Sequence, residues 1–206
     1  MAKATGARDG MSLSMAEPPC VFLDRDGVIN RKRPEGDYVK AWGEFELLPG
    51  VPEALRLLAQ AGCRVVIVTN QRGVALGRMT VQGVEEIHRR MREALAQAGA
   101  RVDGVYYCPH DNGSCDCRKP GTGLFRRAQR DLGYVDFSHA VVIGDSEKDM
   151  EAGSRLGCRT VLLVEPGAAA EKLAELRARG IPITGHAASL LEAVVEHVIT
   201  HAHPIL

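Results

Sequence analysis

The fold is decided by the stretch Cys20-Val21-Phe22-Leu23-Asp24-Arg25-Asp26-Gly27. An apolar run that ends in acidic residues is typical of a buried strand with carboxylates at its carboxyl end. Residues two apart on an extended segment point to one side, so Asp24 and Asp26 can address one phosphoryl group and one Mg²⁺ ion. Asp24 could attack the phosphorus, and Asp26 could transfer the proton. Taken alone, the motif fits a polar turn after a strand about equally well.

Apolar runs further along the chain predict four more strands, at 64–68, 102–107, 140–143 and 160–164. Apolar residues at helical spacing predict helices that end at Gly62, Gly99, Gly133 and Gly157, and a last helix over 188–198. The third and fourth of these helices are expected to begin at residues 124 and 149. Strands that alternate with helices and are apolar throughout indicate a parallel sheet covered on both faces. We therefore expect an α/β, Rossmann-like fold.

Polar residues follow three of the predicted strands. In open α/β sheets the ligand lies beyond the carboxyl ends of the strands, which here carry Asp24, Thr69 and Asp145. The Thr69 hydroxyl could bind a phosphate oxygen or cap its strand. Asp145 could complete an oxygen shell for Mg²⁺. Asp149 could cap the following helix, and we place it behind the metal ligands. Lys119 could neutralise both Asp24 and a phosphate, although a solvated basic loop is the alternative.

Three cysteines and one histidine fall within ten residues, as Cys108, His110, Cys115 and Cys117. A Cys₃His set suits tetrahedral zinc, and four protein ligands leave no open position, so such a zinc would be structural. A disulfide is the alternative, which Cys-x-Cys spacing and a reducing compartment both disfavour. Coincidence is a second alternative.

The composition bounds the remaining possibilities. The 206 residues suit one domain. With 26 basic and 26 acidic residues, the chain lacks the excess of positive charge that a nucleic-acid-binding protein needs. No apolar run has the length of a membrane span, and the N-terminus lacks the apolar core of a secretory signal. We expect a disordered leader over 1–19, a single domain over 20–206 and a cytoplasmic protein that is a monomer or a weak homo-oligomer.

The chain resembles the haloacid-dehalogenase-type phosphohydrolases, on residues that occur in the order Asp24-x-Asp26-Gly27, Thr69-Asn70, Lys119, Gly144-Asp145. The resemblance implies a Rossmann-like core with a minimal cap, catalytic Mg²⁺ and an aspartyl-phosphate intermediate. It implies that Asp24 is the nucleophile, Asp26 the acid and base, and Asp145 a metal ligand. Asp24 and the backbone carbonyl of Asp26 would also bind Mg²⁺. Phosphate would bind Thr69 and Lys119.

Longer segments are similar to a narrower branch, which holds heptose bisphosphate and histidinol-phosphate phosphatases and carries the same zinc loop. These segments are residues 22–30, Thr69-Asn70-Gln71 and the run from Tyr106 to Pro120. By position, substrate contacts are implied for Asn70, Gln71 and Arg118. The arginine that such enzymes carry near position 76 is replaced by Leu76. Either Arg72 takes its place, or the substrate differs.

The expected activity is removal of the 7-phosphate from D-glycero-D-manno-heptose 1,7-bisphosphate. A histidinol-phosphate phosphatase, or another phosphatase of small phosphate esters, is the alternative. A polynucleotide phosphatase would need a basic, aromatic-lined stripe, which this sequence of zero net charge lacks. A phospho-acceptor signalling module would hold its aspartyl-phosphate for long periods, and a zinc-loop adaptor would leave Asp24, Thr69 and Asp145 without a role.

Overall fold

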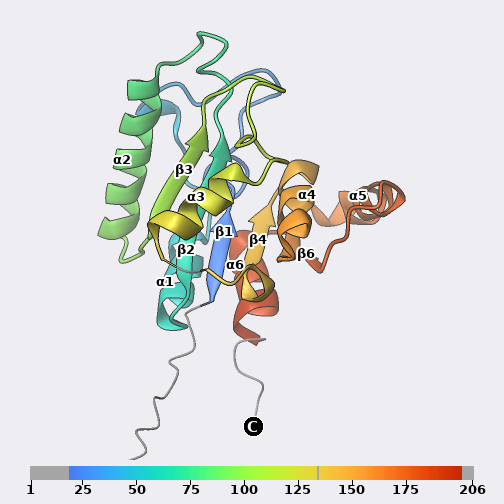
Figure 1. Cartoon of the computed structure of the whole chain (residues 1–206). Coiled ribbons are helices and arrows are strands. Elements are labelled where there is room, and N and C mark those ends of the chain that lie inside the picture. Colours follow the sequence, from blue (N-terminus) through green and yellow to red (C-terminus); the bar gives the residue numbers. More distant parts are fainter. Residues whose placement is uncertain (1–18, 134, 201–206) are drawn as a thin grey trace, which may run out of the picture.

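One parallel sheet organises the protein, seen in a computed structural model that describes residues 19–133 and 135–200. Its six strands lie in the order β3-β2-β1-β4-β5-β6, and every neighbouring pair is parallel (Figure 1). The strands are β1 Cys20–Leu23, β2 Arg64–Asn70, β3 Gly104–Cys108, β4 Val141–Gly144, β5 Arg159–Leu163 and β6 Gly185–Ala187. The expected α/β fold is confirmed.

Strand β1 lies at the centre of the sheet, and all four of its residues are buried. Val21 pairs with Val65 of β2 on one side and with Val141 of β4 on the other. The chain adds β2 and β3 on one side and then returns to β4 on the other. This reversal is the switch point at which open α/β sheets bind ligands, and β1 ends there, immediately before Asp24.

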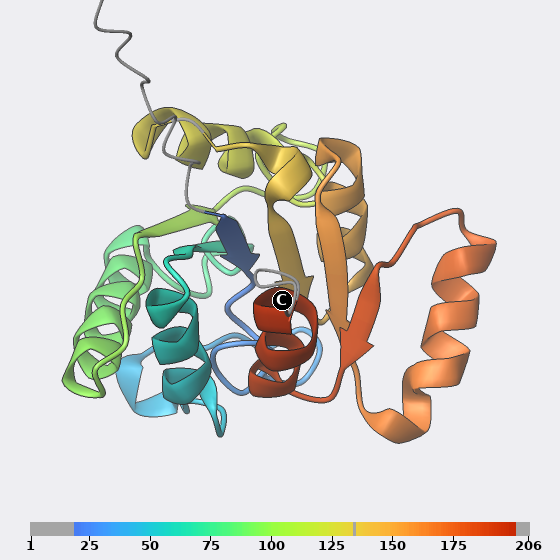
Figure 2. The ribbon, with the colours of Figure 1, turned by 90° about the horizontal axis from the view of Figure 1, so that it is seen from below.

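Helices cover both faces of the sheet (Figure 2). Helix α1 Val51–Gln60, α2 Val81–Gln97 and α6 Leu190–Val194 pack on one face, where Leu55, Met91 and Val194 join one apolar core. Helix α3 Gly123–Asp131 and α4 Glu147–Leu156 pack on the other face around Phe22 and Phe125. Helix α5 Pro166–Ala178 extends that second layer beside α4.

The structure differs from the sequence-based elements at several places. Strand β3 begins two residues later than predicted, and α3 and α4 begin earlier. Strand β6 and helix α5 were not predicted, because β6 has three residues and α5 has no clear apolar stripe. The last helix divides into α6 and a π-helical turn, Val195–Ile199. The expected leader falls, except for residue 19, outside the described residues.

No helix among the described residues combines the length and apolar character that a membrane crossing needs.

Candidate active site

Asp24 follows β1 directly and lies at the carboxyl edge of the sheet. Its backbone N–H donates to the carbonyl of Ile143 on β4 at 3.0 Å, which fixes it between the two central strands. The backbone N–H of Arg25 donates to Asp24 Oδ1 at 2.7 Å. Burial raises the pKa of Asp24 to about 7; Lys119 opposes this shift, and the carboxylates of Asp149 and Asp145 reinforce it.

Lys119 is the cation that compensates this buried charge. Only 3% of its side chain is exposed, and its Nζ lies 2.9 Å from Asp24 Oδ1 and 2.5 Å from Asp149 Oδ1. The ammonium also donates to the carbonyl of Val68 at 2.6 Å. Burial lowers the pKa of Lys119, but the two carboxylates outweigh that effect and raise it above its ordinary value. The lysine therefore stays charged beside Asp24.

Three carboxylates, those of Asp24, Asp145 and Asp149, offer oxygens that all lie within 4.8 Å of one another. Asp145 Oδ2 accepts from Lys32 at 2.7 Å, whereas Asp145 Oδ1 is buried without a hydrogen-bond partner among the described residues. A buried oxygen without a partner beside two further carboxylates fits a hard divalent cation. The donor set therefore suits Mg²⁺.

Asp149 also caps helix α4. The hydroxyl and backbone N–H of Ser146 both donate to its Oδ2, at 2.5 and 3.2 Å. The sequence offered this cap as the alternative to a role beside the metal. The structure adds that the same carboxylate contacts Lys119 and stands in the acidic group.

Gly27 makes room for Asp145. Its φ of +91° lies in the region that favours glycine, and a Cβ built at this position would lie 2.3 Å from Asp145 Oδ2. The glycine after Asp26 is thus required by close approach as well as by the turn.

Asp26 points into a set of hydrogen-bond donors and not toward the other carboxylates. The guanidinium of Arg25 binds both of its oxygens at 2.9 Å. Asn30 Nδ2 and Gln71 Nε2 donate to it, each at 2.9 Å. Burial raises the pKa of Asp26, but Arg25 and these hydrogen bonds outweigh burial and hold it below its usual value.

The residues that end β2 hold the site together. Thr69 is buried, and its hydroxyl accepts from Gln71 Nε2 at 3.0 Å. The Asn70 side chain bridges the backbone of Lys119, accepting from its N–H at 3.0 Å and donating to its carbonyl at 3.1 Å. Asn70 therefore couples β2 to the loop that carries the buried lysine.

Gln71 and Arg72 lie apart from the cavity described next. Gln71 is buried against Asp26 and Arg25, and Arg72 forms an ion pair with Asp111 at 2.5 Å. Each of these two side chains is therefore engaged by a neighbouring residue and does not line the cavity.

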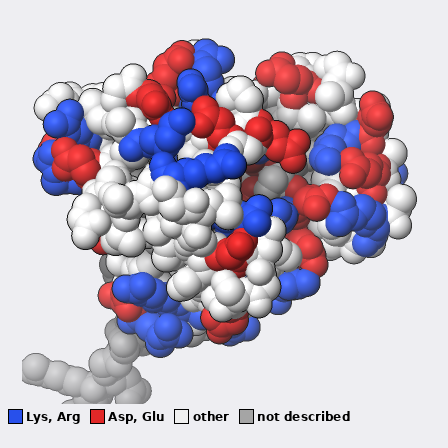
Figure 3. All heavy atoms as spheres, turned by 90° about the horizontal axis from the view of Figure 1, so that it is seen from above, with Lys and Arg blue, Asp and Glu red and all other residues white. Residues whose placement is uncertain are grey.

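A cavity of about 250 Å³ opens over the carboxylates. One wall is the segment 32–39, and Arg118 and Ser146 also line it. Basic and acidic side chains lie interspersed on this face of the molecule (Figure 3). The basic residues that line the cavity are Lys32, Arg33, Arg118, Lys119 and Lys148. A larger cavity, of about 580 Å³ between β3 and α3, is lined by none of the three grouped carboxylates.

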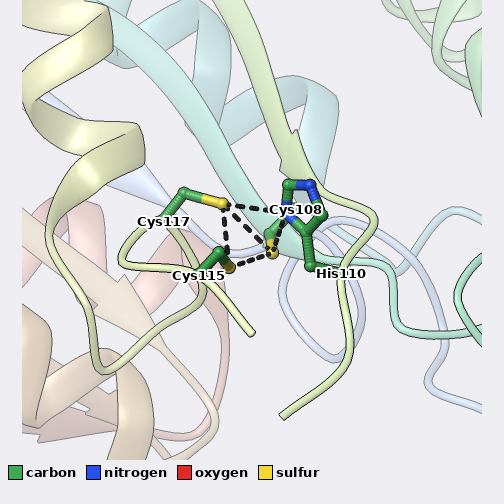
Figure 4. A group of neighbouring side chains, drawn as sticks. All are labelled: Cys108, His110, Cys115 and Cys117. Atoms are coloured by element: carbon green, nitrogen blue, oxygen red, sulfur yellow. Dashed lines mark hydrogen bonds between the residues drawn. The ribbon is translucent and has the colours of Figure 1, made fainter. Parts of the chain in front are cut away.

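Cys108, His110, Cys115 and Cys117 converge as the sequence predicted (Figure 4). The three sulfur atoms lie 3.2 to 3.5 Å apart, and His110 Nδ1 lies 3.3 Å from Cys117 Sγ. A disulfide needs about 2.05 Å, so the cysteines are not bonded to one another. Thiolates bound to one tetrahedral zinc would lie about 3.8 Å apart, and the observed separations are close to that. The donor set fits zinc.

This cysteine loop is tied to the active site. Gln71 N–H donates to the Cys108 carbonyl at 2.8 Å, and Arg118, next to Cys117, donates from Nε to Asn112 at 2.8 Å. The loop thus positions the residues immediately before Lys119.

Comparisons with known proteins agree with this geometry. A family model described as HAD-hydrolase-like matches residues 116–193. A D-glycero-beta-D-manno-heptose-1,7-bisphosphate 7-phosphatase of Pseudomonas aeruginosa is 38% identical over 178 residues, which are 85% of this chain and 97% of that protein. The chain belongs to the haloacid-dehalogenase-like phosphatase family. This confirms the family and the branch that the sequence motifs indicated.

Two further relatives of this haloacid-dehalogenase-like phosphatase are also named as heptose 1,7-bisphosphate phosphatases. A D-glycero-alpha-D-manno-heptose-1,7-bisphosphate 7-phosphatase of Mycobacterium tuberculosis is 45% identical over 64% of this chain and 70% of its own length. The crystal structure of a D,D-heptose 1,7-bisphosphate phosphatase from B. bronchiseptica, complexed with magnesium and phosphate, superposes with a TM-score of 0.76. It is 35% identical and covers 86% of this chain and 97% of its own.

Three side chains around Asp26 in this phosphatase received no role from the sequence motifs. They are Arg25, Asn30 and His88, all buried. A signal for His88 is present in the sequence, because Val84 and Met91 precede and follow it at helical spacing on the buried face of α2. That spacing places His88 among buried residues, but it gives no indication of the contact with Arg25.

Proposed function

We propose that this protein is a Mg²⁺-dependent phosphatase that removes the 7-phosphate of D-glycero-D-manno-heptose 1,7-bisphosphate through an aspartyl-phosphate on Asp24. The observation that carries the proposal is the ion pair of Asp24 with the buried Lys119 at the switch point, beside two further carboxylates. Two relatives that match most of this chain over nearly their whole length are named for heptose 1,7-bisphosphate. Neither is named for histidinol phosphate.

In the first half of the reaction, an Asp24 oxygen attacks the phosphorus and the bond to the sugar oxygen breaks. The electron pair goes to the leaving oxygen, which takes a proton from Asp26. Because the contacts around Asp26 favour its ionised form, this carboxylate must take up that proton when the substrate binds. Lys119 neutralises Asp24 and the phosphoryl oxygens, and Thr69 offers a hydroxyl beside them.

In the second half, water attacks the phosphorus of the aspartyl-phosphate, and Asp26 takes the proton from that water. Inorganic phosphate leaves, and the Asp24 carboxylate is restored. Because Arg25 and the hydrogen bonds around it hold the pKa of Asp26 low and favour the ionised form, Asp26 is suited to act as the base in this step.

Asp24, Asp145 and the backbone carbonyl of Asp26 would hold the Mg²⁺, with Asp149 as a further candidate. When bound, the ion would supply positive charge against the phosphoryl oxygens. Zn²⁺ would bind Cys108, His110, Cys115 and Cys117 and stabilise the loop before Lys119.

A substrate with two phosphates needs a second cationic site. Arg118 Nη1 is buried and has no hydrogen-bond partner among the described residues, and it belongs to a residue that lines the cavity. Lys32 and Lys148 line the same cavity. These groups could receive the phosphate that is not transferred. We also propose a substrate contact for Asn70, which lines the cavity. Gln71 and Arg72 would have to leave their contacts with Asp26 and Asp111 to reach the substrate.

A cytoplasmic location and a monomer or weak homo-oligomer are also proposed.

The test is phosphate release from both anomers of the heptose bisphosphate and from histidinol phosphate, with and without Mg²⁺. We expect turnover of a heptose bisphosphate only with Mg²⁺, and a loss of about 10³-fold or more in Asp24→Asn. Asp131→Asn, which removes an exposed carboxylate on α3, is the matched control and should retain activity. Faster turnover of histidinol phosphate would refute the substrate assignment.

A further inference from the structure

A buried arginine joins the candidate acid and base to helix α2. The side chain of Arg25 is 0% exposed, and its Nη2 binds both oxygens of Asp26. On its other side, Nη1 lies 3.0 Å from Nε2 of His88, which is itself 6% exposed. Gln71 Oε1 accepts from Nη2 at 3.2 Å.

The hydrogen bond from Arg25 defines the state of His88. A guanidinium has only donors, so His88 Nε2 must accept, and the ring must be neutral with its proton on Nδ1. Burial, and then the charge of Arg25, lower the pKa of His88 to about 3, while Asp26 opposes this shift. The ring is also fixed by an edge contact with Tyr107, at 5.4 Å between centroids.

We propose that His88 is a positioning residue for proton transfer: it holds Arg25, which in turn orients the Asp26 carboxylate. This inference rests on the proposed function, in which Asp26 protonates the leaving oxygen. Without an acceptor at position 88, Nη1 becomes a buried donor with no partner. The guanidinium would then turn to satisfy it, and Asp26 would lose its orientation.

Two substitutions of His88 separate this role from simple packing. Gln is neutral at every pH and carries an oxygen that can accept from Arg25, whereas Leu has similar size and no acceptor. The readout is kcat/KM for a sugar phosphate, whose leaving alkoxide needs a proton, and for p-nitrophenyl phosphate, whose leaving group does not.

For His88→Leu we expect a loss of about 10- to 100-fold on the sugar phosphate and less than about threefold on the aryl ester. His88→Gln should restore most of the lost activity. Equal losses on both substrates, or equal behaviour of Gln and Leu, would overturn the positioning role.

Asp26→Asn distinguishes failure of this inference from failure of the proposed function. It should show the same dependence on the leaving group, to a larger extent. If it does and His88→Leu does not, the role of His88 is refuted; if Asp26→Asn shows none, the proposed mechanism is refuted. Nitrogen NMR of the unaltered protein tests the tautomer without any substitution, and a proton on Nε2 would contradict the inference.

Discussion

At the scale of single residues, one buried cation balances two carboxylates. Lys119 contacts both Asp24 and Asp149. The pKa of Lys119 is raised, so the lysine stays charged, and the pKa of Asp24 is raised as well, so this carboxylate is more easily protonated than an exposed one. Removing one member of a buried pair leaves the others uncompensated, which costs far more than losing an exposed pair.

Lys119→Met should therefore abolish phosphatase activity and lower the free energy of unfolding by about 3 kcal/mol in urea without Mg²⁺. Lys148→Met removes an exposed lysine from the same cavity, and its effect on stability should stay below about 0.5 kcal/mol. Equal stability of the two variants would contradict the compensating role of Lys119.

His88 predicts a pH dependence of stability. Its pKa falls from 6.5 to about 3 on folding, so below pH 6.5 the unfolded chain binds a proton that the folded protein excludes. The contribution of His88 to the free energy of unfolding is therefore fully present above pH 6.5 and is lost as the pH falls toward 3.

Relative to His88→Gln, the unaltered protein should lose about 1.4 kcal/mol of stability per pH unit below about 6.5. Denaturant titrations at about pH 7.5 and 5.5, on either side of the histidine's ordinary pKa, measure this difference. The comparison within the pair cancels the opposite slope of Asp24, whose pKa is raised. Parallel pH profiles would show that His88 is protonated in the folded protein.

At the scale of elements, turns and loops position the residues that follow the strands. The turn after β1 needs glycine because Asp145, from the end of β4, approaches it closely. The cysteine loop that follows β3 leads into Lys119.

Gly27→Ala should displace Asp145 and weaken Mg²⁺ binding by about tenfold or more, measured by calorimetry. Gly62→Ala also has a positive φ, but its Cβ would meet nothing within 4 Å. Both variants should lose about 1 kcal/mol of stability from the backbone, and only Gly27→Ala should bind Mg²⁺ more weakly.

Removal of zinc should loosen the cysteine loop. We expect purified protein to contain about one zinc ion per chain, and Cys117→Ser or a strong chelator to lower both the melting temperature and activity. Cys63→Ser, at a buried cysteine outside the group, should retain the zinc. Metal analysis checks each variant, and protein without zinc would refute the site.

At the scale of the whole molecule, one apolar core runs from β1 through α1 and α2 to α6. Elements from both ends of the described chain thus share a core, so we expect them to unfold together. Trp42 fluorescence and far-UV circular dichroism should report the same midpoint in urea. Separate transitions would show that the described residues form more than one cooperative unit.

The sequence alone determined the five longer strands, the parallel α/β class and the two groups of candidate metal ligands. Each depends on local pattern: apolar runs of strand length, or cysteines and acids at short spacing. Only the tertiary structure decided which side chains surround Asp26, because Arg25 and His88 are 63 residues apart and meet only when α2 packs on the sheet. It also decided that Gln71 and Arg72 make supporting contacts, since a side chain's direction depends on partners that distant segments supply.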